Sequence, residues 1–212
     1  MTDLVSERQR VIDTARAMNA SGLNRGTSGN VSLRCAGGFL ITPTGMAYDG
    51  LTPEDIVLVA MDGTPQGTRK PSSEWRFHRD ILAERPDLNA VVHTHATHCT
   101  AVAILGVPIP ALHYSIAAAG GHDIRCAPYE IFGSQELAVS VVAALKDRRA
   151  CLMAHHGMIA CHATPERALA LAGTIEELAR LYLLCRAAGE VPVLAPQAMA
   201  EVLERFGTYG QQ

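Results

Sequence analysis

Two adjacent glycines, Gly37 and Gly38, stand between two short strand-like segments at 30–35 and 39–42. Such a pair between β-forming runs indicates a hairpin, because a tight turn needs backbone angles that glycine adopts most easily. The sequence therefore predicts a sheet that is at least partly antiparallel. This prediction constrains the fold more than any other single feature.

Helix-like and strand-like patterns alternate along the remaining chain. The further expected strands are 56–61, 90–95 and 150–154, and the expected helices are 3–21, a segment after 95 that ends at Leu105, and 165–188. One more helix should begin at Ser72 or Ser73, with a serine as its N-cap, and end at Arg85 ahead of Pro86. The pattern predicts an α/β fold with helices on the faces of the sheet.

The bulk composition narrows the class of protein. The chain has 212 residues, of which 48% are apolar, so we expect one domain that spans residues 1–212. The net charge is −3, and no basic run is uninterrupted, so neither a nucleic acid nor a membrane surface is an expected partner. We find no secretory leader and no membrane-spanning stretch, and the six cysteines lack regular spacing. We therefore expect a cytoplasmic protein with reduced thiols.

Two histidine pairs carry the clearest chemical signal. His93 and His95 stand at the end of an expected strand, where side chains two residues apart share a face and can bind one cation. His155 and His156 end another expected strand, and only one of them should reach the same ion while its neighbour forms outer hydrogen bonds. Three imidazoles with an open fourth position are typical of catalytic zinc.

Other polar residues could complete such a site. Glu74 follows the two serines and could carry a proton, although a glutamate in a first helical turn is also favourable without any function. His78 shares a helix face with Glu74 and could steady its carboxylate, or could equally be a surface histidine. His98 is as consistent with packing or orientation as with metal binding.

Three loops suit a phosphate group. They are Gly26-Thr27-Ser28-Gly29-Asn30, Thr42-Pro43-Thr44-Gly45 and Ser72-Ser73, and each offers hydroxyls and backbone N–H groups in turn geometry. Nucleotide-binding glycine motifs are missing from the sequence. Together with a metal, the loops indicate a small anionic substrate.

In order and spacing, these segments resemble the class II aldolase family, and most closely its fuculose-1-phosphate aldolases. The resemblance covers nearly the whole chain and is carried by GTSGNVS, LITPTG, PSSEWRFH, AVVHTHATHCTAV, HYSIAAAGG, CAPYEIFG, HHGMIAC and a final TYG. It implies a three-layer α/β/α sandwich around a largely antiparallel sheet. It also implies a homotetramer with C4 symmetry and active sites at the subunit interfaces.

The resemblance also implies roles for residues. One divalent metal per subunit, usually zinc with manganese or cobalt as alternatives, would be held by His93, His95 and His156, and by Glu74 when substrate is absent. Glu74 would be the acid/base. Tyr114 from a neighbouring subunit would assist at the aldehyde oxygen, and Tyr209 would help to close the site. The phosphate of dihydroxyacetone phosphate would be bound by Gly29, Asn30, Thr44, Gly45, Ser72 and Ser73.

The implied reaction is reversible aldol cleavage of a ketose 1-phosphate to dihydroxyacetone phosphate and an aldehyde. The cation would stabilise the enediolate that the broken bond leaves. L-Fuculose 1-phosphate and a 5-deoxy- or 5-methylthio-pentulose 1-phosphate are rival substrates. The alternatives are a sugar-phosphate epimerase, dehydratase or decarboxylase of the same family, a zinc-dependent hydrolase, and a non-enzymatic domain like the adducin head. Trp75 and Glu74 favour the aldolase branch over the epimerases, which resemble an SSD pattern there.

Overall fold

The core of the protein is an eight-stranded sheet with strand order β4-β3-β2-β1-β5-β8-β7-β6. We describe it from a computed structural model, which covers residues 4–208. Every pairing in the sheet is antiparallel except that of β6 with β7. The strands are β1 (Asn30–Cys35), β2 (Gly38–Ile41), β3 (Val57–Val59), β4 (Pro65–Gln66), β5 (Ala90–Thr94), β6 (Arg125–Ala127), β7 (Ala150–Met153) and β8 (Gly157–His162).

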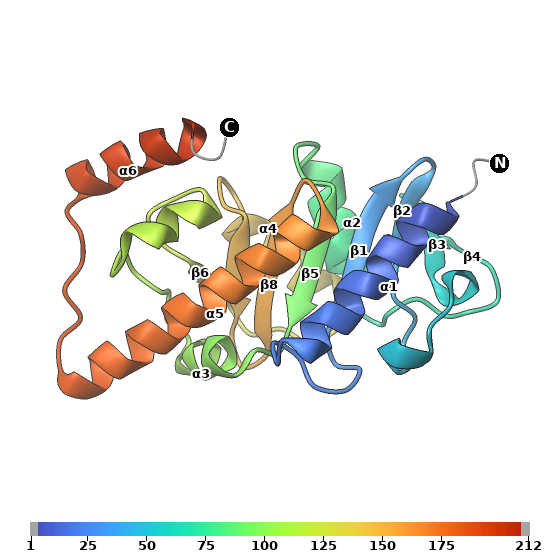
Figure 1. Ribbon diagram of the computed structural model, residues 1–212, viewed down its shortest axis with the longest axis horizontal. Helices are drawn as coiled ribbons and strands as arrows, with labels where there is room; N and C mark the ends of the chain where they lie inside the picture. The colour runs from blue at the N-terminus through green and yellow to red at the C-terminus, as the bar shows by residue number, and fades with distance from the viewer. Residues whose placement is uncertain (1–3, 209–212) are drawn as a thin grey trace.

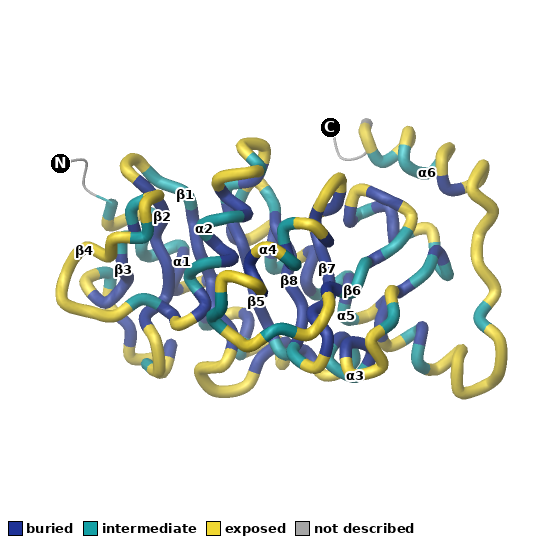
Figure 2. Tube along the Cα trace, turned by 180° about the vertical axis from the view of Figure 1, so that it is seen from behind, coloured by how far each residue is buried: buried dark blue, intermediate teal, exposed yellow. Residues whose placement is uncertain are grey.

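Helices cover both faces of this sheet, which makes three layers (Figure 1). On one face lie α1 (Val5–Ala20), α3 (Thr97–Leu105) and α5 (Pro165–Ala188), and on the other lie α2 (Trp75–Glu84) and α4 (Gln135–Ala144). A separate apolar cluster fills each helix–sheet interface. In Figure 2 the central strands of the sheet are mostly buried, while the edge strand β4 is exposed. The predicted α/β/α sandwich with a largely antiparallel sheet is confirmed.

The predicted hairpin forms between β1 and β2. Gly37 has a φ of +86°, and a Cβ on Gly38 would lie 2.1 Å from the carbonyl oxygen of Val59 on β3. The first glycine is therefore needed for the turn, and the second for close strand packing.

Helix α2 begins later than the sequence predicts. It starts at Trp75 with Glu74 as its N-cap, so neither serine caps it. The backbone N–H of Ser72 donates to the carbonyl of Thr42 at 3.0 Å, and the Ser72 hydroxyl accepts from the N–H of Glu74 at 3.3 Å. The two serines thus connect the end of β2 to α2. The helix begins after them because the backbone of Ser72 bonds to Thr42, a residue distant in the sequence.

The chain ends in an exposed arm. After α5, an extended segment carries α6 (Pro196–Thr208) back over η3, the 3-10 helix Tyr114–Ala119 (Figure 1). Across the part of the chain that the structure describes, no helix is both long and apolar enough to cross a bilayer.

Candidate active site

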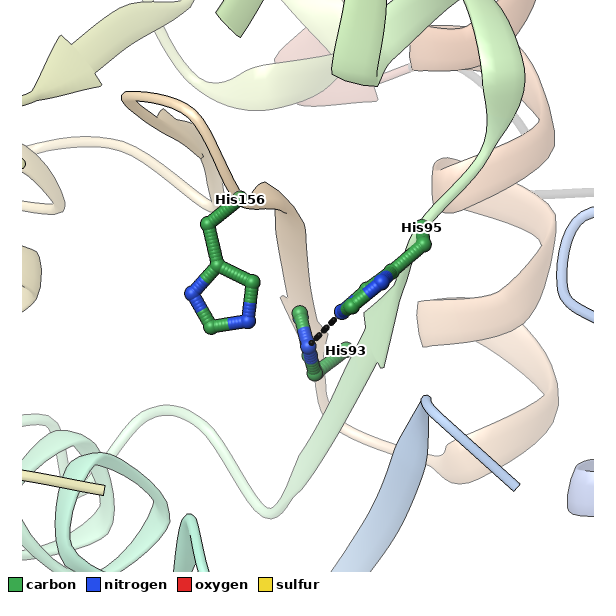
Figure 3. A group of neighbouring side chains, drawn as sticks. All are labelled: His93, His95 and His156. Carbon is green, nitrogen blue, oxygen red and sulfur yellow. Dashed lines mark hydrogen bonds between the residues drawn. The ribbon is translucent and has the colours of Figure 1, made fainter. Parts of the chain in front are cut away.

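Three histidines meet at one end of the central strands. His93 and His95 project from the end of β5 on the same face, and His156 comes from the turn between β7 and β8 (Figure 3). One ring nitrogen of each lies within 4.8 Å of the others, and the Nε2 atoms of His93 and His95 are 3.0 Å apart. The strand period of two explains this convergence.

The turn between β7 and β8 separates its two histidines. His155 has a φ of +55°, and its backbone N–H donates to the carbonyl of Ala103 on α3. Its exposed ring lies 6.1 Å from that of Tyr129, and no described residue forms a hydrogen bond with it. The expectation that His155 forms hydrogen bonds around the metal is therefore not met, and its exposed side chain instead lines the cavity described below.

Glu74 faces the three histidines from the N-terminal end of α2. Its Oε2 atom lies 3.2 Å from Nε2 of His93, and its Oε1 atom lies 3.2 Å from Nε2 of His156. The residue is only 5% exposed. Burial on its own would raise the pKa of Glu74, but His93 and His156 hold it well below its ordinary value. The carboxylate is therefore charged at neutral pH.

The separations suit a tetrahedral cation. Metal–ligand bonds of about 2.0–2.1 Å at a tetrahedral zinc place neighbouring ligand atoms about 3.3 Å apart. The separation of 3.0 Å between His93 and His95 and that of 3.2 Å between His93 and Oε2 of Glu74 are close to this value, while His156 lies 3.2 Å from the other oxygen of Glu74 and within 4.8 Å of the two histidines. Among the described residues, Oε1 of Glu74 is buried without a hydrogen-bond partner. A cation bound by these four residues would satisfy that oxygen, so the donor set fits a zinc-like ion.

The histidines are also held in forms that can bind a cation. Nδ1 of His93 lies 2.9 Å from the carbonyl oxygen of Met158, so Nδ1 donates there and Nε2 is the ring nitrogen that faces His95 and Glu74. Burial, together with His93 and His156, lowers the pKa of His95 to about 4. His95 is therefore a neutral ligand at physiological pH.

Two further histidines support the site from outside. His78 is fully buried, so it is not the surface histidine that the sequence left open, and burial lowers its pKa to about 3. His98 lies at the start of α3, where its Nδ1 is 2.7 Å from Oε1 of Glu176 on α5. The same carboxylate accepts from the backbone N–H groups of His98 and Cys99 and thereby caps α3.

A cavity of about 460 Å³ opens above the histidines and Glu74. Its lining residues are Thr27, Ser28, Thr44, Gly45, Ser73, Glu74, His95, Tyr129, Glu130, Phe132, His155 and His156. Of the residues expected to bind phosphate, Thr44, Gly45 and Ser73 are exposed in this cavity. Gly29, Asn30 and Ser72 are buried and are not among the lining residues.

The comparisons agree with this geometry. The family model for the class II aldolase and adducin N-terminal domain matches residues 9–183. The chain belongs to the class II aldolase family. The predicted family membership is therefore confirmed.

Several class II aldolases resemble the chain over almost its full length. An L-fuculose phosphate aldolase of Escherichia coli O6:H1 is 55% identical over 95% of this chain and 94% of its own. A 5-methylthioribulose-1-phosphate/5-deoxyribulose-1-phosphate aldolase of Rhodospirillum rubrum is 52% identical over 97% of this chain and 93% of its own. A solved L-fuculose 1-phosphate aldolase structure superposes with a TM-score of 0.93 at 35% identity, covering 98% of both chains.

Of the two tyrosines assigned to the site by resemblance, only Tyr114 can be placed, and it lies apart from the cavity. Tyr114 is 52% exposed at the start of η3, with its ring 6.4 Å from that of Phe206 on α6, and it is not among the residues that line the cavity. Tyr209 lies outside the described residues.

Some cavity residues had no role of their own in the sequence analysis. Tyr129, Glu130 and Phe132 line the cavity and were not singled out, whereas Thr27 and Ser28 were named only as part of a loop that suits a phosphate. The first three occur in the CAPYEIFG segment, and the last two in GTSGNVS, so both groups stand inside recognised motifs. Nothing in the spacing distinguishes a lining residue from its neighbours in such loops.

Proposed function

We propose that this class II aldolase catalyses the reversible, metal-dependent cleavage of a ketose 1-phosphate to dihydroxyacetone phosphate and an aldehyde. One observation carries the proposal: three imidazoles and a charged carboxylate converge at the floor of a cavity lined elsewhere by hydroxyl-bearing loops. Two groups of relatives are named as aldolases of sugar 1-phosphates, which supports this choice.

The metal would be held by His93, His95 and His156, with Glu74 as a further ligand in the resting enzyme. Zinc is the proposed ion, because neutral imidazoles and one carboxylate at these separations suit it, and manganese and cobalt are alternatives. When bound, such a dication supplies Lewis-acid stabilisation of the negative charge that develops on the ketose oxygens as the carbon–carbon bond breaks.

Glu74 would move the proton. In the cleavage direction, the bond between the third and fourth sugar carbons breaks, and the hydroxyl on the fourth carbon loses its proton as it becomes the aldehyde. A proton is then delivered to the third carbon, which becomes the hydroxymethyl carbon of dihydroxyacetone phosphate. Among the described residues, the only polar contact of Oε1 of Glu74 is with Nε2 of His156 at 3.2 Å, and Glu74 lines the cavity, which supports its role in this transfer.

The exposed loops would bind the phosphate. Thr44, Gly45 and Ser73 offer hydroxyls and backbone N–H groups at the cavity, while Gly29, Asn30 and Ser72 would shape the loops from behind. The cavity has about 460 Å³, which suits a small phosphorylated sugar.

We also propose a C4 homotetramer in which Tyr114 of one subunit acts in the site of the next. The exposure of Tyr114 outside its own cavity supports this arrangement. Tyr114 would protonate or deprotonate the aldehyde oxygen, and Tyr209 would close the site. Mixing inactive Glu74→Gln and Tyr114→Phe subunits should restore part of the activity, whereas each variant alone stays inactive. No recovery after mixing would defeat the shared site.

The cytoplasm is the proposed location, because all six cysteines are unpaired, as expected in a reducing compartment.

A panel of ketose 1-phosphates tests the function and ranks the substrates. L-Fuculose 1-phosphate, 5-deoxyribulose 1-phosphate and 5-methylthioribulose 1-phosphate would each be supplied to the zinc-loaded protein. Release of dihydroxyacetone phosphate, coupled to NADH oxidation, is the expected result. Release of inorganic phosphate in its place would identify a hydrolase, and inversion of the sugar without cleavage would identify an epimerase. The chelator-treated protein is the control.

A further inference from the structure

A line of three buried polar side chains leads from the sheet to Glu74. The hydroxyl of Ser32 lies 2.7 Å from Nδ1 of His78, and Nε2 of His78 lies 2.5 Å from Oδ1 of Asn30. The amide nitrogen of Asn30 then donates to Oε2 of Glu74 at 2.9 Å. Each side chain of this line, Ser32, His78 and Asn30, is therefore hydrogen-bonded to the next, and Asn30 is bonded to Glu74.

None of the three residues belongs to the cavity lining. Ser32 and His78 are fully buried, and Asn30 is 2% exposed. Asn30 and Ser32 lie on β1, two residues apart on one face, while His78 reaches them from the second turn of α2. The β1–β5 register puts Asn30 directly opposite His93, so this line of residues ends beside the histidine cluster.

The charge of Glu74 sets the direction of every bond in the line. A carboxylate oxygen can only accept, so the Asn30 amide must present its N–H group to Glu74 and its oxygen to His78. Nε2 of His78 must then donate, which leaves Nδ1 to accept from the Ser32 hydroxyl. If the amide were reversed, two oxygens would face each other at 2.9 Å.

We propose that His78 is a positioning residue that fixes the Asn30 amide and, through it, holds the Glu74 carboxylate against the metal and the reacting carbon. The inference rests on the proposed function of Glu74. Packing alone does not require this polar line, because apolar side chains in place of Ser32, His78 and Asn30 together would fill the same space without the cost of burying polar groups. The polar line instead gives one carboxylate a single orientation.

Two substitutions at His78 separate positioning from packing. His78→Leu replaces the imidazole with an apolar side chain of similar size and removes the hydrogen bonds to Ser32 and Asn30. His78→Gln keeps a donor toward Asn30. We expect His78→Leu to lower zinc affinity and kcat by about 10- to 100-fold each, with KM little changed, and His78→Gln to recover most of both. Zinc affinity would be measured by chelator competition, and kcat at saturating zinc.

A double-mutant cycle identifies the route of the effect. Zinc affinity would be measured for Glu74→Gln alone and combined with His78→Leu. If His78 acts through Glu74, the second substitution adds almost nothing in this background. The inference would be overturned if His78→Leu lowered zinc affinity equally in the wild-type and Glu74→Gln backgrounds. It would also be overturned if folded His78→Leu had an unchanged zinc affinity and kcat.

Ser32→Ala keeps the test available if His78→Leu does not fold. It removes only the outermost bond of the line, so we expect a loss of zinc affinity of about fivefold, in the range of one neutral hydrogen bond, that again disappears in the Glu74→Gln background. A loss that persists in that background would overturn the inference. Failure of the wild-type protein to cleave any ketose 1-phosphate would defeat the proposed function. The double-mutant cycle of zinc affinities tests the role of His78 independently of that activity.

Discussion

The cavity has two unlike walls. The wall that we propose to hold the metal, called the metal wall, consists of Glu74, His95 and His156 with the buried His93 behind them. It is built from strand ends and a helix start, and His93 and Glu74 are each held by a further hydrogen bond, to Met158 and to Asn30. The loop wall consists of Thr27, Ser28, Thr44, Gly45 and Ser73, all of them exposed. The metal wall is therefore held in place before a substrate binds, while the loop wall presents its side chains to solvent.

This contrast suggests that the two walls have different functions in catalysis and binding. Groups that stabilise a transition state are effective when they are held in place beforehand, as the metal wall is. Groups that only bind a phosphate act equally on substrate and transition state. Changes in the metal wall should therefore lower kcat or metal content, and changes in the loop wall should raise KM.

Loss of a proposed metal ligand should have the largest effect. His93→Ala removes a fully buried imidazole from the centre of the cluster and leaves the Glu74 carboxylate without one of its partners. We expect zinc affinity to fall by at least about 100-fold, beyond what loss of an outer hydrogen-bond partner costs. Elemental analysis after dialysis would measure this, with circular dichroism to show that the chain still folds. His122→Ala, an exposed histidine elsewhere, is the matched control. Full zinc occupancy in His93→Ala would contradict the assigned site.

Loss of Glu74, the proposed proton carrier, should have the second-largest effect. Glu74→Gln keeps the shape of the side chain and leaves three imidazoles to hold zinc, but it removes the acid/base. At saturating zinc, kcat for aldol cleavage should fall by about 10²–10⁴-fold with KM nearly unchanged. Steady-state kinetics with the best substrate of the panel would test this. A variant that retained full kcat would remove Glu74 from the mechanism.

The metal wall was also the easier one to predict from the sequence. Period-two alternation brings His93 and His95 to one face whatever the rest of the fold, and α5 has the predicted bounds because its capping Thr164 and Pro165 are local signals. The hairpin at Gly37 and Gly38 is equally local. Such features need no knowledge of distant residues.

The remaining features depend on tertiary pairing. The burial of His78 follows from α2 packing on β1, and the late start of α2 follows from the bond between Ser72 and Thr42. The left-handed His155 arises in a turn with no glycine at that position. None of these contacts has a signature at fixed sequence spacing, so the sequence left His78 open and misjudged His155.

A glycine behind the metal wall gives a smaller effect, on stability. A Cβ on Gly29 would lie 2.6 Å from the carbonyl oxygen of His93, so Gly29→Ala must push β1 away from β5. We expect a loss of about 1–3 kcal/mol, as for overpacked sites, or roughly 2–4 °C in Tm for each kcal/mol. Gly50→Ala is the control, because a Cβ there meets nothing within 4 Å. Thermal unfolding would compare them, and equal Tm values would show that the two strands can separate freely.

The loop wall should show the smallest effect. Ser73→Ala removes one exposed hydroxyl from the cavity and leaves α2 intact, because Ser73 does not cap that helix. If the hydroxyl binds the substrate phosphate, its loss costs about 1 kcal/mol, so KM should rise by about 3- to 10-fold while kcat is unchanged. Ser6→Ala, on the exposed side of α1, should change neither constant. A fall in kcat with constant KM would instead assign Ser73 to the chemical step, and the division between the two walls would be lost.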